Sequence, residues 1–361
     1  MERVTFLVCV SSLLLFLVSG HGLDQKEEIG IYELRKGNVC LKLTNWGATL
    51  VSFVRPDKNG KLIDIVLGYD SVKQYQNDTT YFGSIVGRVA NRIGGAQFKL
   101  DGHLYKLVPN EGKNMLHGGP KGFADVVWKV YKYTNKSPAP HIVFTYTSFD
   151  GEEGFPSSLQ VRVTYRLLDC NRLSIVMKAK NVGTKATPVS LAQHAYWNLG
   201  GHNSGDILSE SIQIFGSKYT PVDSDLIPTG KIVHVKGTPY DFLNPAVIRS
   251  KINKLAKGYD INYVLEDGEN RGIRRAAVLC DHKSGINMEL STNAPGLQFY
   301  TGNMIKDVKG KGGCVYKAHS GLCLETQWWP DYVNHPKFPQ SVVEPGKTYK
   351  HFMLFKFSTA K

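Results

Sequence analysis

The chain has 361 residues, of which 42% are hydrophobic and 21% are charged, and its formal net charge is +13 at pH 7. This balance is typical of a globular protein with a large core, and it excludes an intrinsically disordered chain. The lysines and arginines are scattered and form no long basic tract, so we expect a solvated basic surface and no nucleic-acid partner. The charge is also compatible with loose attraction to an acidic matrix such as a cell-wall polysaccharide.

The N-terminal segment has the layout of a secretory signal peptide. Arg3 precedes an apolar run over residues 4–18, and glycines suited to cleavage follow at positions 20 and 22. We therefore predict that residues 1–22 form a signal peptide and that residues 23–361 form one secreted domain without a transmembrane span. The run is shorter than the roughly 20 residues of a membrane-spanning helix. The alternative is retention in the endoplasmic reticulum or an uncleaved membrane anchor.

Two glycosylation patterns and the cysteines bear on the same question. Asn77-Asp-Thr79 and Asn135-Lys-Ser137 agree with secretion and predict a glycoprotein. The five cysteines after Cys9 are an odd number and lie far apart, so they do not suit a disulfide framework and argue weakly against secretion. At most, Cys314 and Cys323 would form one bridge.

The first part of the mature chain reads as short β-strands separated by turns. Runs of apolar residues predict strands over residues 29–34, 39–43, 49–54 and 64–67. The dipeptide Asn59-Gly60 suits the positive φ angles of a tight turn. A short helical turn follows as far as Gln76, with Asp70 as its expected N-cap.

The middle of the chain contains the clearest strand pattern. Apolar residues alternate with polar ones over residues 159–167 and again over residues 173–179, on either side of a short turn. This pattern predicts an antiparallel hairpin with one wet face. Residues 141–148 and 347–357 show similar alternation.

One stretch has a good helix start. Asn244 and Pro245 suit the N-cap and the first helical position of a helix over residues 244–252. The many short strands and few short helices predict an all-β fold, a large antiparallel β-sandwich. Because no low-complexity linker or repeat divides the chain, we predict a single domain.

One carboxylate lies in a short apolar strand near the C-terminus. In Ser320-Gly-Leu-Cys-Leu-Glu325-Thr-Gln-Trp-Trp-Pro-Asp331, Leu322 and Leu324 alternate with Glu325. The leucines are then expected to enter the core while Glu325 projects from the other face, towards the two tryptophans. A carboxylate beside aromatic rings suits a sugar site, because sugars offer both hydroxyls and apolar C–H faces. The alternative is a surface glutamate, with tryptophans that belong to the core.

Five other stretches place polar residues of the kind found in binding sites among glycines. They are Gly87-Arg-Val-Ala-Asn91-Arg92-Ile-Gly94, Asn114-Met-Leu-His117-Gly-Gly-Pro-Lys-Gly-Phe123, Gln193-His194-Ala-Tyr196-Trp197-Asn198-Leu-Gly-Gly201, Tyr259-Asp260-Ile-Asn262-Tyr263 and Ala294-Pro-Gly-Leu-Gln298-Phe-Tyr-Thr-Gly-Asn303. Together with the Glu325 strand and its His335-Pro-Lys-Phe-Pro339 tail, these blocks resemble the aldose 1-epimerase (galactose mutarotase) family. The match keeps the family's order from about Asn45 to the C-terminus.

The resemblance implies an antiparallel β-supersandwich with an open carbohydrate cleft, no metal and no cofactor. It places Glu325 on the family's catalytic base and His194 on its catalytic acid. His117 matches the second site histidine. Four positions match residues that hold sugar hydroxyls, namely Asn91, Arg92, Asp260 and Gln298. The family's Asp-His-Asn block reads Asp260-Ile261-Asn262 here, a change that bears on sugar preference.

The chemistry follows from the same residue types. Interconversion of sugar anomers needs a base that removes the C1 hydroxyl proton and an acid that protonates the ring oxygen, and a carboxylate with an imidazole meets both needs. The sequence has no zinc-ligand spacing and no phosphate-cradling glycine loop. We therefore predict an isomerase of free aldohexoses such as glucose and galactose, as a monomer or weak homodimer. Its pH profile should have an acidic limb from Glu325 and a basic limb from His194.

Two rival functions share this fold. A hexose-6-phosphate epimerase would need a cluster of arginines around the cleft, and only Arg88 and Arg92 are candidates. A secreted or membrane-anchored carbohydrate-binding protein would keep the cleft without using catalysis. Such a protein does not need both Glu325 and His194, so their presence favours the enzyme.

Overall fold

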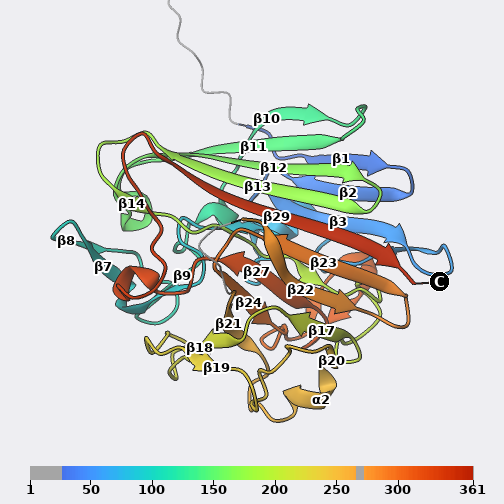
Figure 1. The fold of residues 1–361 in the computed structure, drawn as a ribbon. Helices are drawn as coiled ribbons and strands as arrows, with labels where there is room; N and C mark the ends of the chain where they lie inside the picture. The colour runs from blue at the N-terminus through green and yellow to red at the C-terminus, as the bar shows by residue number, and fades with distance from the viewer. Residues whose placement is uncertain (1–26, 266–271, 361) are drawn as a thin grey trace, which may run out of the picture.

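Antiparallel sheets make up the body of the molecule, as the ribbon in Figure 1 shows. The computed structural model describes residues 27–265 and 272–360, so the leader predicted at residues 1–22 lies outside the described residues. Within these ranges the only α-helices are α1 (Val72–Gln76) and α2 (Arg249–Ile252), and both are short. The predicted all-β fold with few short helices is therefore confirmed.

The largest sheet has nine strands and extends from β10 at the top of Figure 1 to β20 near the bottom. Its order is β10 (Lys129–Thr134), β11 (His141–Ser148), β12 (Leu159–Asp169), β13 (Arg172–Asn181), β29 (Thr348–Thr359), β23 (Ile286–Thr292), β22 (Arg274–Cys280), β17 (Ser211–Ile214) and β20 (Ala246–Val247). A four-stranded sheet lies against it through contacts between β1 and β12, and contains β1 (Ile31–Lys36), β2 (Val39–Thr44), β3 (Thr49–Pro56) and β4 (Leu62–Asp64).

A six-stranded sheet carries several of the predicted site residues. Its order is β16 (Tyr196–Trp197), β27 (Leu322–Gln327), β24 (Gly296–Tyr300), β21 (Asp260–Val264), β18 (Lys218–Thr220) and β19 (Val233–His234). Small two-stranded pairs complete the fold: β5 (Ile85–Val86) with β15 (Ala192–Gln193), β6 (Arg92–Ile93) with β9 (Met115–Leu116), β7 (Gln97–Leu100) with β8 (His103–Lys106), β14 (Thr187–Pro188) with β28 (Val342–Val343), and β25 (Val308–Lys309) with β26 (Val315–Tyr316).

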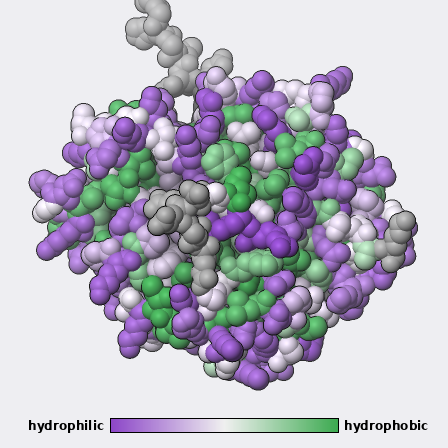
Figure 2. All heavy atoms as spheres, in the orientation of Figure 1, coloured by the Kyte–Doolittle hydropathy of each residue, from purple (hydrophilic) through white to green (hydrophobic). Residues whose placement is uncertain are grey.

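The core lies between the sheets. One buried apolar cluster includes Leu41 of β2, Val163 of β12 and Leu297 of β24, so all three large sheets contribute to it. The predicted hairpin is confirmed, because β12 and β13 pair antiparallel and their buried side chains alternate with exposed ones. On the visible face, Figure 2 shows hydrophilic side chains interspersed with small hydrophobic areas. No helix in the described part of the chain is long and apolar enough to cross a membrane.

Two helix starts were predicted wrongly. Residues Ala246–Val247 form strand β20, which pairs with Ser211 and Ile212 of β17, and α2 begins only at Arg249. Pairing with the edge of the nine-stranded sheet therefore outweighs the local helix signal of Asn244 and Pro245. Helix α1 begins after Ser71 rather than Asp70, because the Ser71 backbone N–H donates to the Gln74 side chain (3.1 Å). Asp70 instead accepts the backbone N–H of Gly312.

Candidate active site

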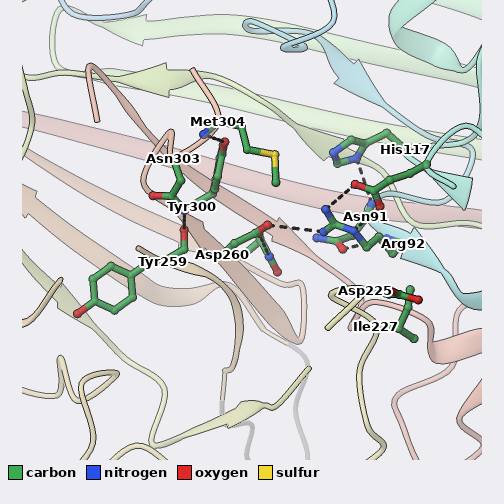
Figure 3. Close-up of polar contacts among 12 residues, drawn as sticks. Asn91, Arg92, His117, Asp225, Ile227, Tyr259, Asp260, Tyr300, Asn303 and Met304 are labelled. Carbon is green, nitrogen blue, oxygen red and sulfur yellow. Dashed lines mark hydrogen bonds and ion pairs between the residues drawn. The ribbon is translucent and has the colours of Figure 1, made fainter. Parts of the chain in front are cut away.

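Six of the seven predicted site residues line a single cavity of about 260 Å³ beside the six-stranded sheet. They are Asn91, Arg92, His117, His194, Asp260 and Glu325. Figure 3 shows how Arg92 and Asp260 face each other, with Asn91 and His117 beside Arg92. The residues come from β27, β21, the start of β6 and three loops, so segments far apart in the sequence meet here. We call this space the Glu325 cavity.

Glu325 and His194 form a close pair at the buried end of this cavity. Glu325 lies within β27, where it is paired with Gln298 of β24, and His194 follows β15. His194 Nε2 and Glu325 Oε2 are 3.7 Å apart, and 6% and 2% of the two side chains are exposed. Glu325 Oε2 has no hydrogen-bond partner among the described residues. The carboxylate is therefore free to act on a bound molecule.

Burial changes the proton affinities of this pair in opposite directions. It raises the pKa of Glu325 well above the ordinary value, and the charge of Asp260 raises this pKa further while Arg92 opposes the shift. Burial also lowers the pKa of His194 to about 4. Burial thus favours the neutral form of both groups: the carboxyl of Glu325 holds a proton more tightly than usual and the imidazole of His194 holds one less tightly.

His117 is held as a hydrogen-bond donor. Its Nδ1 accepts the backbone N–H of Asn91 (3.1 Å), so in the neutral imidazole the proton resides on Nε2. Burial lowers the pKa of His117 well below its ordinary value, which favours this neutral form. The imidazole can therefore donate to an oxygen atom inside the cavity.

The same hydrogen bond bears on metal binding. Ligand atoms of His117, His194 and Glu325 lie within 4.8 Å of one another, a grouping that could hold a metal ion. A metal-ligating histidine usually donates its other ring N–H to an oxygen acceptor. Because Nδ1 of His117 accepts rather than donates, Nε2 keeps its proton and is a poor metal ligand.

The Asn91 and His117 segments fix each other through their backbones. The His117 N–H donates to the Asn91 carbonyl oxygen (3.0 Å), and both residues have positive φ angles, 62° for Asn91 and 52° for His117. The next residue, Gly118, has φ +90°, and a Cβ there would lie 2.0 Å from the carbonyl oxygen of Gly87. Only glycine fits at that position. Gly118 therefore allows the close approach of backbone segments that shapes the site.

A network of charged side chains forms part of the cavity wall. Arg92 binds both carboxylate oxygens of Glu111, at 2.5 and 2.8 Å, and its Nη1 lies 3.7 Å from Asp260 Oδ2. Gln298 donates to Asp260 Oδ1 (2.6 Å) but does not line the cavity. Gln298 is therefore placed to orient Asp260 rather than to reach a ligand directly. Sequence reasoning missed Glu111, whose block carried no signal of its own.

The aromatic side chains of the cavity are tyrosines. Tyr81, Tyr196 and Tyr300 line it, and Tyr81 packs against the rings of His117 and His194. The expectation that Glu325 projects towards the tryptophans is wrong. Both tryptophans belong to the core, where Trp328 packs on Tyr349 and Trp329 packs on Phe338 while donating its indole N–H to Pro295. Trp328 and Trp329 follow the end of β27, which leaves the cavity after Glu325. Their rings therefore lie away from Glu325.

Arg88 does not belong to the site. Its guanidinium is buried and donates to the carbonyl oxygens of Pro156 (2.7 Å) and Ser157 (3.0 Å), away from the cavity lining. Arg92 is then the only arginine that lines the Glu325 cavity within the described ranges, and it is already engaged by Glu111 and Asp260. The arrangement does not suit a phosphate group, which disfavours the hexose-6-phosphate alternative.

Cys323 packs against His194. Its thiol sulfur is 3.6 Å from His194 Nδ1, on the ring edge away from Glu325. The bridge considered between Cys314 and Cys323 is not formed, because both residues are free cysteines. Cys323 is fully buried and so packs against the imidazole ring rather than serving as an exposed thiol.

Comparison with known proteins shows which proteins this chain resembles. The model of the aldose 1-epimerase family matches residues 30–356. The galactose mutarotase of Bos taurus is 40% identical over 331 residues, which cover 91% of this chain and 94% of the relative. The aldose 1-epimerase of Escherichia coli K12 is 35% identical over 326 residues, covering 88% of this chain and 92% of the relative.

Solved structures agree with these relatives. The GalM/aldose epimerase homologue from C. elegans superposes with a TM-score of 0.85 at 30% identity, covering 92% of this chain and 100% of the homologue. Galactose 1-epimerase from Lactobacillus acidophilus gives a TM-score of 0.80 at 25% identity, over 93% and 96% of the two chains. With its sequence, its fold and the buried carboxylate–imidazole pair in agreement, the chain belongs to the aldose 1-epimerase family.

Proposed function

We propose that the protein interconverts the α and β anomers of free aldohexoses such as glucose and galactose. The observation that carries the proposal is the buried pair of Glu325 and His194, one acid and one base 3.7 Å apart, facing a cavity of about 260 Å³. A purely carbohydrate-binding protein has no need to bury an unpartnered carboxylate beside an imidazole, because burial of such a group is costly. The activity named for the relatives agrees with this reading.

The reaction is a proton exchange between the pair and the sugar. Glu325, as base, removes the proton of the C1 hydroxyl while His194, as acid, gives a proton to the ring oxygen, and the C1–O5 bond breaks to leave an open-chain aldehyde. Rotation about C1–C2 presents the other face of the carbonyl group. The O5 hydroxyl then attacks C1, His194 recovers its proton from O5, and Glu325 returns its proton to the carbonyl oxygen.

Glu325 and His194 exchange the same single proton during ring opening and during ring closure. During ring opening the proton moves from His194 to Glu325 through the sugar, and ring closure returns it. The pair therefore ends each turnover in its starting state, with no other reactant consumed. The cycle starts with one proton on His194 and none on Glu325, whereas burial in the empty site favours the neutral form of both groups, so the reactive state is the less populated arrangement of that one proton.

The remaining cavity residues are assigned to holding the sugar. Asp260 and Arg92 offer a charged acceptor and charged donors, and the Nε2–H of His117 offers a neutral donor. Asn91 mainly supports these groups, because its side-chain oxygen accepts the backbone N–H of Arg92 (2.8 Å). Tyr300 and Tyr196 offer ring surface for the apolar C–H faces of a sugar.

Polarimetry tests the proposal directly. Freshly dissolved α-glucose or α-galactose should approach anomeric equilibrium faster with the protein than without it, after subtraction of the spontaneous rate. An accelerated rate supports the proposal. A folded protein that binds either sugar without accelerating the exchange would instead be a carbohydrate-binding protein on the same fold.

Replacing Asp260 by alanine should weaken sugar binding while the fold persists. A charge-assisted hydrogen bond is worth roughly 1.5–3 kcal/mol, so the Michaelis constant should rise by about 10- to 100-fold. Asp225→Ala is the matched control, because Asp225 pairs with Lys113 at the surface and does not line the cavity. If the Michaelis constants of Asp260→Ala stay at the parent values for both sugars, Asp260 is a structural residue.

The pH profile should reflect the reversed proton affinities. The active pair holds one proton, so the acidic limb of kcat/KM arises when His194 gains a second proton and the basic limb when Glu325 loses the last one. This reverses the limb assignment expected from the sequence. Because the charge of Asp260 raises the pKa of Glu325, Asp260→Asn should move the basic limb to lower pH. A basic limb that does not move would contradict this electrostatic coupling.

We also propose that the protein enters the secretory pathway and carries a glycan on Asn77. The leader pattern of residues 1–22 supports entry, and Asn77 is exposed at the end of α1 with its acceptor residue Thr79 also exposed. Asn135 is the weaker acceptor, because it is partly buried and accepts the backbone N–H of Arg35. N-terminal sequencing should find cleavage after the leader, and Asn77→Gln should abolish most of the glycosidase-sensitive mass shift. An intact Met1 on a soluble cytosolic form would contradict this proposal.

The assembly state is proposed to be a monomer or a weak homodimer. Light scattering across a range of protein concentrations measures it directly.

A further inference from the structure

A second hollow, of about 420 Å³, lies on the outer face of the nine-stranded sheet. Its lining side chains come from β10, β11, β12, β13 and β29, five neighbouring strands in the upper part of Figure 1. It shares no lining residue with the Glu325 cavity. We call it the sheet groove.

A row of three cations runs at right angles to the strands; two of them line the sheet groove, and the third, Lys350, lies beside it. Arg162 of β12 stands directly opposite Lys178 of β13, and Lys178 stands directly opposite Lys350 of β29. Neighbouring strands lie about 4.8 Å apart, and like charges in directly opposed positions destabilise a sheet. None of the three forms an ion pair with an acidic residue in the described part of the chain. The fold therefore maintains an uncompensated positive row.

The sheet groove is basic along its whole length. Lys132 and Arg166 also line it, and no aspartate or glutamate does. Arg166 stands directly opposite Ser174 and His141 on its two sides, so it too has no acidic neighbour in register. An anionic ligand would meet cations without competing carboxylates.

Apolar and aromatic surface lies next to the cationic row. Val176 and Phe352 are directly opposed in the adjoining register row, and both are partly exposed. The Arg162 guanidinium lies 4.5 Å from the centre of the Tyr131 ring, and 59% of Tyr131 is exposed. Aromatic rings with wet faces can take the apolar C–H faces of sugar rings while the cations take charged substituents.

We propose that the sheet groove binds an acidic polysaccharide, a polymer of uronic acid whose carboxylates pair with Arg162, Lys178 and Lys350. The polymer would run across the strands, with sugar faces against Tyr131 and Phe352. One cation per strand suits a polymer with one charge per sugar ring. Double-stranded DNA carries one charge per roughly 1.7 Å, nearly three times the density of this row, so it is the poorer match. The groove would hold the protein on an acidic matrix while the Glu325 cavity stays open.

The test uses polygalacturonate and its fully methyl-esterified form, which keeps the sugar backbone without the charge. Calorimetry at low salt should show binding of polygalacturonate, loss of binding as salt rises, and far weaker binding of the ester. The combined substitution Arg162→Gln, Lys178→Gln and Lys350→Gln should weaken binding roughly tenfold or more. Tyr131→Ala should weaken it severalfold, because it removes the exposed ring.

A matched variant separates the sheet groove from net charge alone. Lys61→Gln, Lys257→Gln and Lys309→Gln also remove three exposed lysine charges, away from the groove. This variant should bind polygalacturonate within about twofold of the parent, as expected for surface changes outside the site. Equal weakening by the two triple variants would overturn the proposal, as would no weakening by either. Tighter binding of single-stranded RNA than of polygalacturonate through the same three cations would also overturn it.

Stability and activity provide two further checks on the groove variant. Within it, Lys178→Gln with Lys350→Gln removes repulsion between two directly opposed cations and keeps the contact of Arg162 with Tyr131, so the Tm of this double variant should equal or exceed that of the parent. A lower Tm would contradict the interpretation that these cations are uncompensated. The rate of sugar anomerisation by the groove variant should match that of the parent, since none of the three residues lines the Glu325 cavity.

Discussion

Glu325→Gln is expected to lower the turnover number for α-galactose or α-glucose by roughly 10²- to 10⁴-fold, the loss typical when a general base is removed. Glutamine keeps the size of the side chain but cannot accept the proton of the C1 hydroxyl. The sugar affinity should change far less, because Asp260, Arg92 and His117 remain in place. The measurement is the rate of approach to anomeric equilibrium by polarimetry, corrected for the spontaneous reaction.

Glu210→Gln is the matched control for that experiment. Glu210 is another fully buried glutamate whose pKa burial raises well above the ordinary value, and it accepts the backbone N–H of Leu199 (2.8 Å) outside the Glu325 cavity. Burial favours the neutral form of Glu210, which glutamine resembles in size and charge, so turnover should change little. A folded Glu325→Gln protein that matched the parent rate would rule out the proposed mechanism.

Strand patterns predicted most of the sheet framework because burial on one face leaves a clear two-residue period. The hairpin of β12 and β13 shows this best, since Val163 and Tyr165 are buried while Arg162 and Arg166 are exposed. The predictions failed where the local structure is decided by pairing with a strand that is distant in the sequence. Ala246–Val247 is extended because it pairs with the free edge of β17. The residues around Asn244 give no sign of this pairing, because β17 lies more than 30 residues earlier in the chain.

The site residues could be predicted because they lie in compact blocks with glycines that the local backbone requires. Gly118 next to His117 is an example, since its neighbour Gly87 leaves no room for a side chain. Glu111 was missed because its place in the cavity wall, where it binds Arg92, depends on contacts between segments that are separate in the sequence. The tyrosines were missed for a related reason. Tyr81, Tyr196 and Tyr300 come from three separated segments and look like core residues in the sequence.

Proton affinities were the least predictable property. The chemistry predicts that burial or a neighbouring negative charge raises the pKa of the glutamate, which agrees with the structure, but it leaves the pKa of the histidine near its ordinary value. In the folded protein both side chains are almost fully excluded from water, which favours the neutral form of each and separates the two pKa values. The two pKa values separate because residues of several strands together bury the pair. No local sequence pattern can therefore predict the separation.

His194→Asn should lower turnover to a similar degree as Glu325→Gln, because asparagine cannot deliver a proton to the ring oxygen. The double variant Glu325→Gln, His194→Asn should lose far less than the product of the two single effects, since the groups act as one proton-exchanging unit. Cys323→Ser is the control for packing around the imidazole, because its side chain contacts His194 Nδ1 without reaching the cavity. Polarimetric rates for the parent and these variants give the comparison. Fully multiplicative losses in the double variant would show that Glu325 and His194 act independently, and the shared-proton mechanism would then be wrong.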